Sequence, residues 1–236
     1  MNRQVLVYDG LHRCPYLDGK VARLPLYRQL SPLGWDAADE RFAAAERRVG
    51  RALYRIACPA CTECKGIRVP VRDFRPSRSQ RRVLNRWPEE GRIEVGQATV
   101  SRAKVKLFNL HKRVRGLAEP DDEPMSPEGY MGWLVHSCFD TIEMRYYLGS
   151  RLIGVGILDL GRIGASSVYY YFDTDPEVAQ LSPGVYSALQ ELEFCRRSGR
   201  DYYYLGLYVE GCDKLSYKAQ YRPNERLVDG DWRRFE

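Results

Sequence analysis

The chain has 236 residues, 44% of them apolar and 29% charged, and its formal net charge at neutral pH is +6. These values indicate a folded, globular protein with a buried core, built as one large domain or two small ones, and they exclude a disordered chain. The first ten residues lack the apolar stretch of a signal peptide, and the longest uncharged apolar run, LIGVGIL, is far shorter than the roughly 20 residues that span a bilayer. We therefore expect a cytoplasmic protein without a membrane partner.

The first part of the chain, residues 1–92, combines short apolar runs, clustered cysteines and frequent prolines. It also carries much of the positive charge, since residues 65–86 contain eight positive side chains and a single acid, Asp73. Most of the cations in the chain are arginines, whose forked guanidinium groups bind phosphate or carboxylate through two bonds at once. This part is predicted to be a small cysteine- and arginine-rich domain that binds an anionic partner, with a solvated arginine-rich surface as the alternative.

Four cysteines of this part form a candidate metal site. Cys58, Cys61 and Cys64 recur at every third position, which lets thiolates in a turn converge on one ion. Cys14, the other cysteine of this half, would complete a four-thiolate site. Because clustered thiols in a reducing compartment more often bind metal than form disulfides, we expect a structural zinc ion or an iron–sulfur cluster. Unligated or redox-active thiols are the alternative.

The second part of the chain, residues 93–236, predicts an α+β domain. Apolar positions at helical spacing and helix caps predict three helices, over 101–117, 127–139 and 182–199. Runs of β-branched and aromatic residues predict antiparallel strands over 141–176 and a further strand over 201–209.

An ordered set of motifs covers nearly the whole chain: CPYLDGKVARLPLY, CPACTECKGIRVPV, FRPSRSQRRVLNR, LSPGVYSALQELEF and YYYLGLYVEGCDKLSYKAQYRP. The set resembles the aminoacyl-tRNA protein transferases, which are the arginyltransferases of eukaryotes and their bacterial aspartate/glutamate leucyltransferase relatives. The length matches the compact bacterial members. One departure concerns the CxxC pair of the eukaryotic relatives, because Cys14 is followed here by Pro15, Tyr16 and Leu17. The second thiol of that pair is therefore absent here, and the extra cysteines of CPACTEC look like a bacterial replacement for it.

The resemblance implies a cysteine-bearing domain over residues 1–92 and an acetyltransferase-like (GNAT-like) domain with a mostly antiparallel sheet over residues 93–236. It also implies the activity: transfer of an amino acid, leucine favoured and arginine possible, from aminoacyl-tRNA to the N-terminal α-amine of proteins that begin with Asp or Glu. The product would be an N-degron that directs protein degradation. The ester is already activated, so we expect no cofactor for the chemistry, which would rest on positioning and on donors to the oxyanion.

The tRNA would be bound by the cations beside the cysteines and by those of the first predicted helix in the second domain. The candidates are Arg75, Arg78, Gln80, Arg81 and Arg82, extended by Lys104, Lys106 and Arg113.

The acidic N-terminal residue of the acceptor would meet a cation. The candidates within the matched motifs are Arg68, Arg78, Lys218 and Arg222. The attacking amine would be positioned or deprotonated by a carboxylate or phenol at a strand end. The candidates are Tyr170, Asp173 and Tyr208, whose alternative roles are those of turn and core residues.

Two other classes of protein stay open. An acetyl-CoA-dependent N-acetyltransferase shares the implied fold, but a glycine-rich turn usually binds its pyrophosphate, and QLSPGVYSAL has Pro183 and one glycine there. A non-catalytic, metal-dependent RNA-binding module would explain the cysteines and arginines but not the second domain. Incubation with charged tRNA and an Asp-headed peptide separates the three.

Overall fold

The computed structural model describes residues 4–118 and 122–236. Its largest sheet has eight strands in the order β14-β13-β7-β12-β11-β10-β9-β8. The strands are β7 (Lys65–Pro70), β8 (Gly91–Gln97), β9 (Asp140–Leu148), β10 (Arg151–Leu160), β11 (Gly164–Phe172), β12 (Tyr202–Tyr208), β13 (Asn224–Val228) and β14 (Asp231–Phe235). Neighbouring strands are antiparallel except for β11 and β12, which are parallel. The predicted α+β class and the mostly antiparallel sheet are therefore confirmed.

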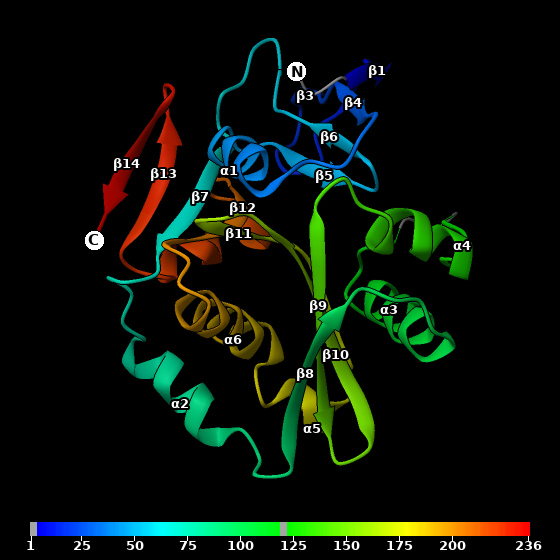
Figure 1. Ribbon diagram of the computed structural model, residues 1–236, viewed down its shortest axis with the longest axis vertical. Helices are drawn as coiled ribbons and strands as arrows, with labels where there is room; N and C mark the ends of the chain where they lie inside the picture. The colour runs from blue at the N-terminus through cyan, green and yellow to red at the C-terminus, as the bar shows by residue number, and fades with distance from the viewer. Residues whose placement is uncertain (1–3, 119–121) are drawn as a thin grey trace.

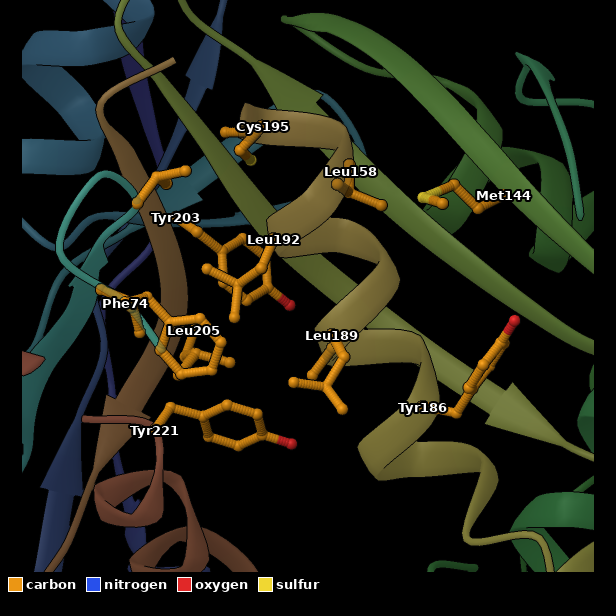
Figure 2. Close-up of a cluster of buried hydrophobic side chains, with 14 of the residues drawn as sticks. Phe74, Met144, Leu158, Tyr186, Leu189, Leu192, Cys195, Tyr203, Leu205 and Tyr221 are labelled. Carbon is orange, nitrogen blue, oxygen red and sulfur yellow. The ribbon is translucent and has the colours of Figure 1, made fainter. Parts of the chain in front are cut away.

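Helix α6 (Pro183–Arg197) covers one face of this sheet (Figure 1). Its apolar side chains, among them Leu189, Leu192 and Cys195, pack into the main hydrophobic cluster of the protein. Figure 2 shows Leu192 beside Tyr203 of strand β12. The helix lies where Pro183 and the apolar stripe predicted it, because burial of that stripe against the sheet stabilises it.

The opposite face is covered by α3 (Arg102–Val114), α4 (Pro127–Tyr130) and the π-helical turn η1 (Met131–Val135). Phe108 of α3 lies at the centre of this second cluster, where its ring meets that of Tyr171 edge-on at 5.3 Å between centroids. Helices on both faces bury the sheet, which explains why its central strands are apolar on both sides.

Two predicted details of these helices are wrong. The helix expected over 127–139 ends at Val135, because the carbonyls at its end bond to Arg48 rather than continuing a helical ladder. Ser182, which its residue type predicts to be the N-cap of α6, does not cap the helix through its side chain. It adopts a left-handed conformation, φ 56°, and its hydroxyl makes no capping bond. Pro183 nevertheless begins the helix.

The first part of the chain forms two small sheets beside the large one. The four-stranded sheet has the order β1-β4-β6-β5 and the two-stranded sheet pairs β2 with β3. The strands are β1 (Gln4–Tyr8), β2 (Leu11–Arg13), β3 (Val21–Arg23), β4 (Leu26–Gln29), β5 (Arg47–Val49) and β6 (Ala52–Tyr54). Helix α1 (Trp35–Ala43) follows β4 and buries Phe42 against Phe139 and Tyr204 of the second part of the chain.

Strand β7 links the two parts of the chain, since it lies between β12 and β13 in the large sheet. Strand β8 spans the predicted boundary at residues 92 and 93, so the division into residues 1–92 and 93–236 stays a prediction. Between β7 and β8, helix α2 (Arg78–Arg86) packs against α6. The remaining short helices are α5 (Pro176–Ala179), α7 (Asp213–Ser216) and η2 (Tyr217–Gln220). Within residues 4–118 and 122–236, none of the helices combines the length and the apolar character needed to cross a bilayer.

Candidate active site

The parallel strands β11 and β12 separate after a short stretch of pairing. They share three register pairs, the last of which joins Ser166 to Tyr204. Each strand then carries a β-bulge: Val168 has no partner on β10, and Leu205 has none on β7. Bulges bend strands and are frequent beside active sites. We call this divergence, between residues 167–172 and 205–208, the fork.

The guanidinium of Arg47, the first residue of β5, lies at the base of the fork. Its Nη1 donates to Ser166 Oγ at 3.2 Å, and its Nη2 donates to the carbonyl oxygens of Ser167 at 2.8 Å and Val168 at 3.3 Å. On the other strand, Gly206 has φ 91°, and a Cβ there would lie 3.0 Å from Arg47 Cζ. Arg47 therefore satisfies the backbone of the bulge in β11, and a glycine in β12 leaves room for it.

A second cation, Lys218 of η2, lies close to Arg47. Its amine donates to the carbonyl of Leu207 at 2.9 Å, two residues after the bulge in β12. Burial of the amine, followed by the positive charge of Arg47, lowers the pKa of Lys218 to about 7. At neutral pH this amine therefore exists in both its charged and its neutral form.

A buried carboxyl group, Glu191 of α6, lies against the same strands. Ser187 Oγ donates to its Oε1 at 2.9 Å, and Tyr203 of β12 donates to its Oε2. Burial raises the pKa of Glu191 to about 7, although both hydrogen bonds favour the carboxylate. A Cβ at Gly156 of β10 would lie 2.7 Å from Oε1, so the missing side chain of this glycine makes space for the carboxyl group.

Two tyrosine hydroxyls near Glu191 are buried without a hydrogen-bond partner among the residues that the structure describes. They belong to Tyr170 of β11 and Tyr221, and the pKa of each is raised by burial and by the charge of Glu191. The Tyr170 ring meets that of Tyr146 edge-on at 5.6 Å. Buried hydroxyls without partners are uncommon and mark places where a substrate or water group can bind.

The three predicted catalytic residues are not brought into contact with one another among the described residues. Tyr170 lies beside Glu191, as above. Asp173 directly follows β11, forms an ion pair with Arg151 at 2.6 Å and behaves as a turn residue. Tyr208 is buried under the guanidinium of Arg226, 4.0 Å from its ring centroid.

Of the predicted acceptor-binding residues, Lys218 lies at the fork. Arg68 is paired with Glu225 at 2.7 Å and lies over the rings of Tyr202 and Trp232, so its charge is already matched. Arg222 is exposed and donates to backbone carbonyls near the end of the chain. Arg78 is exposed at the first turn of α2.

The predicted tRNA contacts lie on two faces of the sheet. Those of α2, together with Arg75 just before it, lie on the α6 side, whereas those of α3 lie on the opposite side (Figure 1). The exposed members are Arg75, Arg78, Arg81, Arg82, Lys106 and Arg113. The structure therefore does not gather the predicted contacts into one patch.

Two of the predicted tRNA contacts are buried. Gln80 closes a capping box with Ser77 at the start of α2. Lys104 forms a buried ion pair with Glu143, with Nζ 2.5 Å and 2.7 Å from its two oxygens. Both side chains have structural partners, which argues against phosphate contacts from either.

The four cysteines of the candidate metal site lie in one region of the molecule. Burial, followed by the neighbouring thiols of Cys14, Cys58 and Cys61, raises the pKa of Cys64 to about 12. In the part of the chain that the structure describes, no three His, Cys, Asp or Glu side chains are grouped closely enough to hold a metal ion. The thiols are thus neighbours without ligating geometry, and the metal site stays a prediction.

Sequence reasoning missed Arg47 and Glu191. Glu191 carried a usable signal, because it lies three residues after Ala188 and four before Cys195 on the apolar stripe of α6. A glutamate is rarely buried unless it is paired, so its place on a buried stripe indicates a specific partner or role. Arg47 carried no such signal, since its role depends on bulges in strands more than a hundred residues away.

Two family models together match most of the chain. The family model described as arginine-tRNA-protein transferase, N terminus, matches residues 12–82, and the model described as arginine-tRNA-protein transferase, C terminus, matches residues 103–228. An aspartate/glutamate leucyltransferase of Acinetobacter baumannii (strain ATCC 17978) is 33% identical over 94% of this chain and 81% of its own length. The enzyme of that name from Aeromonas hydrophila is 33% identical over 100% of this chain and 98% of its own.

Among solved structures, the C-terminal domain of a putative lysylphosphatidylglycerol synthetase from Agrobacterium fabrum is similar, with a TM-score of 0.50. The match covers 96% of this chain and 82% of that one at 11% identity. This likeness concerns the fold alone.

Proposed function

This chain belongs to the arginine-tRNA-protein transferase family, and from that premise we propose that it transfers one amino acid from aminoacyl-tRNA to the N-terminal α-amine of proteins that begin with Asp or Glu. Leucine is the favoured donor, because the similar enzymes from Acinetobacter and Aeromonas are named leucyltransferases. Arginine is the second candidate, since the family models carry its name. The extended protein would carry an N-degron.

The reaction is an aminolysis of an ester. The lone pair of the N-terminal amine attacks the ester carbonyl, a C–N bond forms, and the C–O bond to the ribose breaks. The amine loses a proton and the ribose oxygen gains one, so the step needs no external oxidant, reductant or cofactor. Positioning of the two substrates and stabilisation of the oxyanion supply the catalysis.

The fork is the observation that supports this chemistry at a defined place. Two parallel strands diverge there at bulges, and the cations Arg47 and Lys218 lie between them. Two adjacent cations suit the acidic side chain of the acceptor, and strand edges suit an extended peptide. We therefore assign the N-terminus of the acceptor to the fork. Divergent parallel strands in a mostly antiparallel sheet also support the finer assignment to an acetyltransferase-like fold.

Proton movement at the fork would involve Glu191 and Tyr170. Glu191 titrates near neutral pH, which is the range in which a group can both accept and return a proton. It is fully enclosed, so it acts through a hydroxyl that contacts it and is a positioning residue. The hydroxyls that bond to Glu191 are those of Ser187 and Tyr203. The hydroxyl of Tyr170 is buried and has no partner in the described chain, so it is free to bond to a substrate group that reaches it.

The four cysteines are proposed as a structural site for zinc or an iron–sulfur cluster in a small N-terminal domain. Their proximity supports the assignment, since Cys64 is influenced by the other three thiols. A bound metal would stabilise the thiolate forms, while the transfer reaction would be carried out at the fork.

The function is tested by incubating the protein with leucyl-tRNA or arginyl-tRNA and a peptide that begins with Asp. Mass spectrometry should detect addition of one leucine, and a peptide with a blocked N-terminus should stay unchanged. Tight tRNA binding without addition would support the RNA-binding module instead. Modification by acetyl-CoA in the absence of tRNA would support the acetyltransferase.

A further inference from the structure

A groove of about 500 Å³ lies between the four-stranded sheet and η1, outside the fork. Its floor is one face of that sheet, where Arg28 pairs with Ala52 and Ala52 pairs with Val49. Trp133 and His136 form its wall. The described residues that line the groove include no acid, so its charged and titratable groups are two guanidiniums and an imidazole.

The wall of the groove is fixed to its floor by buried bonds. The N–H of Gly50 donates to the carbonyl of Trp133 at 3.2 Å, and Nη1 of Arg48 donates to the carbonyls of Trp133 at 3.0 Å and His136 at 3.2 Å. A Cβ at Gly50, which has φ 57°, would lie 2.5 Å from the carbonyl oxygen of Gly132. The groove is therefore preorganised, which lowers the entropic cost of binding a ligand.

The cations of the groove are available. Arg28 and Arg51 are both exposed, and neither forms an ion pair with a residue that the structure describes. Their neighbour Arg48 differs, since Asp159 neutralises it. Two unmatched guanidiniums in one concave site attract an anionic ligand.

An aromatic surface lies beside these cations. Trp133 is half-buried and lines the groove, and its ring packs against that of Tyr169 at 5.2 Å and that of Phe108 at 5.6 Å. A rigid indole next to guanidiniums is the combination on which bases of single-stranded nucleic acid stack while their phosphates are bound.

The groove adjoins the fork. Strand β5 begins with Arg47 at the fork and ends with Val49 at the groove, two residues or about 7 Å further along. Tyr169, which contacts Trp133, directly follows the bulged residue Val168. One side of the groove therefore lies beside the fork.

We propose that this groove binds the single-stranded 3′ end of the aminoacyl-tRNA, with backbone phosphates at Arg28 and Arg51 and a base against Trp133. The inference rests on the proposed function, since it places the ester next to the fork. An acidic peptide is the less suitable occupant, because a single terminal carboxylate leaves the second guanidinium and the indole unused.

The test compares binding of intact tRNA with binding of the same tRNA from which the unpaired 3′-terminal nucleotides have been removed. For the unmodified protein, trimming should weaken binding by about tenfold, as loss of one or two phosphate contacts and a stacked base would. For the double variant Arg28→Ala/Arg51→Ala, intact tRNA should bind as weakly as trimmed tRNA does to the unmodified protein. For this variant, trimming should weaken binding by less than about twofold, and the slope of the salt dependence should fall by about 1 to 2.

Two further variants complete the experiment. Arg28→Lys/Arg51→Lys keeps the charge and should keep most of the dependence on the 3′ end. Arg196→Ala/Arg197→Ala removes the same charge from the exposed side of α6, where both guanidiniums bond to Glu193, and should bind as the unmodified protein does. A thermal melt checks that each variant folds.

The proposal is overturned if the Arg28→Ala/Arg51→Ala protein keeps the full loss on trimming. It is also overturned if trimming has no effect on the unmodified protein, or if the double variant raises the KM for an Asp-headed peptide while its response to trimming is unchanged. In that last case the groove binds the peptide. Because these readouts are binding measurements, failure of amino-acid transfer would count against the proposed function and leave this result standing.

Discussion

Arg48 and Asp159 form a buried ion pair that connects the first part of the chain to the large sheet. Nε of Arg48 lies 2.8 Å from Oδ2 of Asp159, and the two side chains are 1% and 2% exposed. Thr141 Oγ1 donates to Oδ1 of the same carboxylate at 2.6 Å. Nη1 and Nη2 of Arg48 donate to the carbonyls of Trp133 and Leu134 in η1 and to those of Gly50 and His136, which directly follow β5 and η1. Both charges are thus fully hydrogen-bonded, as buried charges must be.

Asp159→Asn should lower the free energy of unfolding by about 3 to 5 kcal/mol, because it leaves a buried guanidinium without its counter-ion. Urea denaturation measures the change. Asp36→Asn is the matched control, since Asp36 pairs with Arg162 at an exposed site and its substitution should leave the free energy of unfolding nearly unchanged. Equal effects of the two substitutions would show that burial of the Arg48 pair has no energetic weight.

Glu191→Gln should change how stability depends on pH. The raised pKa of Glu191 means that the folded protein keeps a proton that the unfolded chain releases between about pH 4.5 and 7, so stability falls as pH rises through this window. The variant lacks this titration. In thermal melts its melting temperature relative to that of the unmodified protein should therefore be higher at pH 8 than at pH 4. A difference that does not vary with pH would argue that Glu191 titrates normally.

The same substitution tests the role of Glu191 in transfer. At pH 7, kcat should fall by about tenfold to a thousandfold if Glu191 takes part in proton movement, and the KM for either substrate should change little. The pH dependence of kcat should also lose its step near 7. An unchanged profile would reduce Glu191 to a structural residue.

Lys218→Met should act on both stability and acceptor use. Because burial lowers the pKa of Lys218 to about 7, the unfolded chain binds a proton that the folded protein lacks above this pH, and stability rises with pH up to about 10.5. The slope is at most about 1.4 kcal/mol per pH unit, and the variant should lose it.

In transfer assays, Lys218→Met should raise the KM for an Asp-headed peptide by about tenfold, with tRNA affinity unchanged, because one cation at the fork is gone. Arg222→Glu is the informative companion, since Arg222 is exposed and donates to backbone carbonyls. If Arg222→Glu impairs the acceptor and Lys218→Met does not, the acceptor site lies at Arg222.

Substitutions on α2 and α3 should separate tRNA contacts from structural cations. Arg81→Ala/Arg82→Ala should weaken tRNA binding and reduce its salt dependence by a slope of about 1 to 2, with little effect on stability. Lys104→Met should instead destabilise the fold by about 3 kcal/mol, because it leaves Glu143 buried without its closest partner. Filter binding and urea denaturation distinguish them, and the opposite pattern would restore Lys104 as a contact.

Metal content decides the role of the cysteines. Protein purified without oxygen should contain about one equivalent of zinc or an iron–sulfur cluster, and Cys64→Ser should lose it. Binding should release protons, because the pKa of Cys64 in the metal-free fold is raised to about 12. Cys195→Ser is the control, since Cys195 is a buried residue of α6 in the main hydrophobic cluster and should not alter metal content. Absence of both metals would remove the proposal.

Local patterns predicted much of this fold. Pro183 and Gly199 bracket α6, and the aromatic and β-branched runs after Thr141 form β9 to β11, because each is stabilised by contacts close in sequence. The family and the nature of its substrates also followed from ordered motifs.

What sequence could not predict depends on distant contacts. The position of β7 in the large sheet requires partners from the last strands, and Arg47 meets a bulge that exists only once β10 and β11 have paired. Lys104 is expected on the surface because it lies in a basic helix, but the fold places Glu143 opposite it and buries both side chains. A positive residue in a sequence therefore indicates an anionic partner, but not whether that partner is a ligand or an acidic side chain of the same chain.

The place of β7 also constrains the order in which the molecule can assemble. Both neighbours of this strand, β12 and β13, begin at Tyr202 or later, so during synthesis its two edges stay bare until those strands have left the ribosome. Bare edges of apolar strands recruit other chains. A translation product that stops before β12 should therefore aggregate, and a chaperone that shields β7 would be needed most while the ribosome is still decoding the second half of the message.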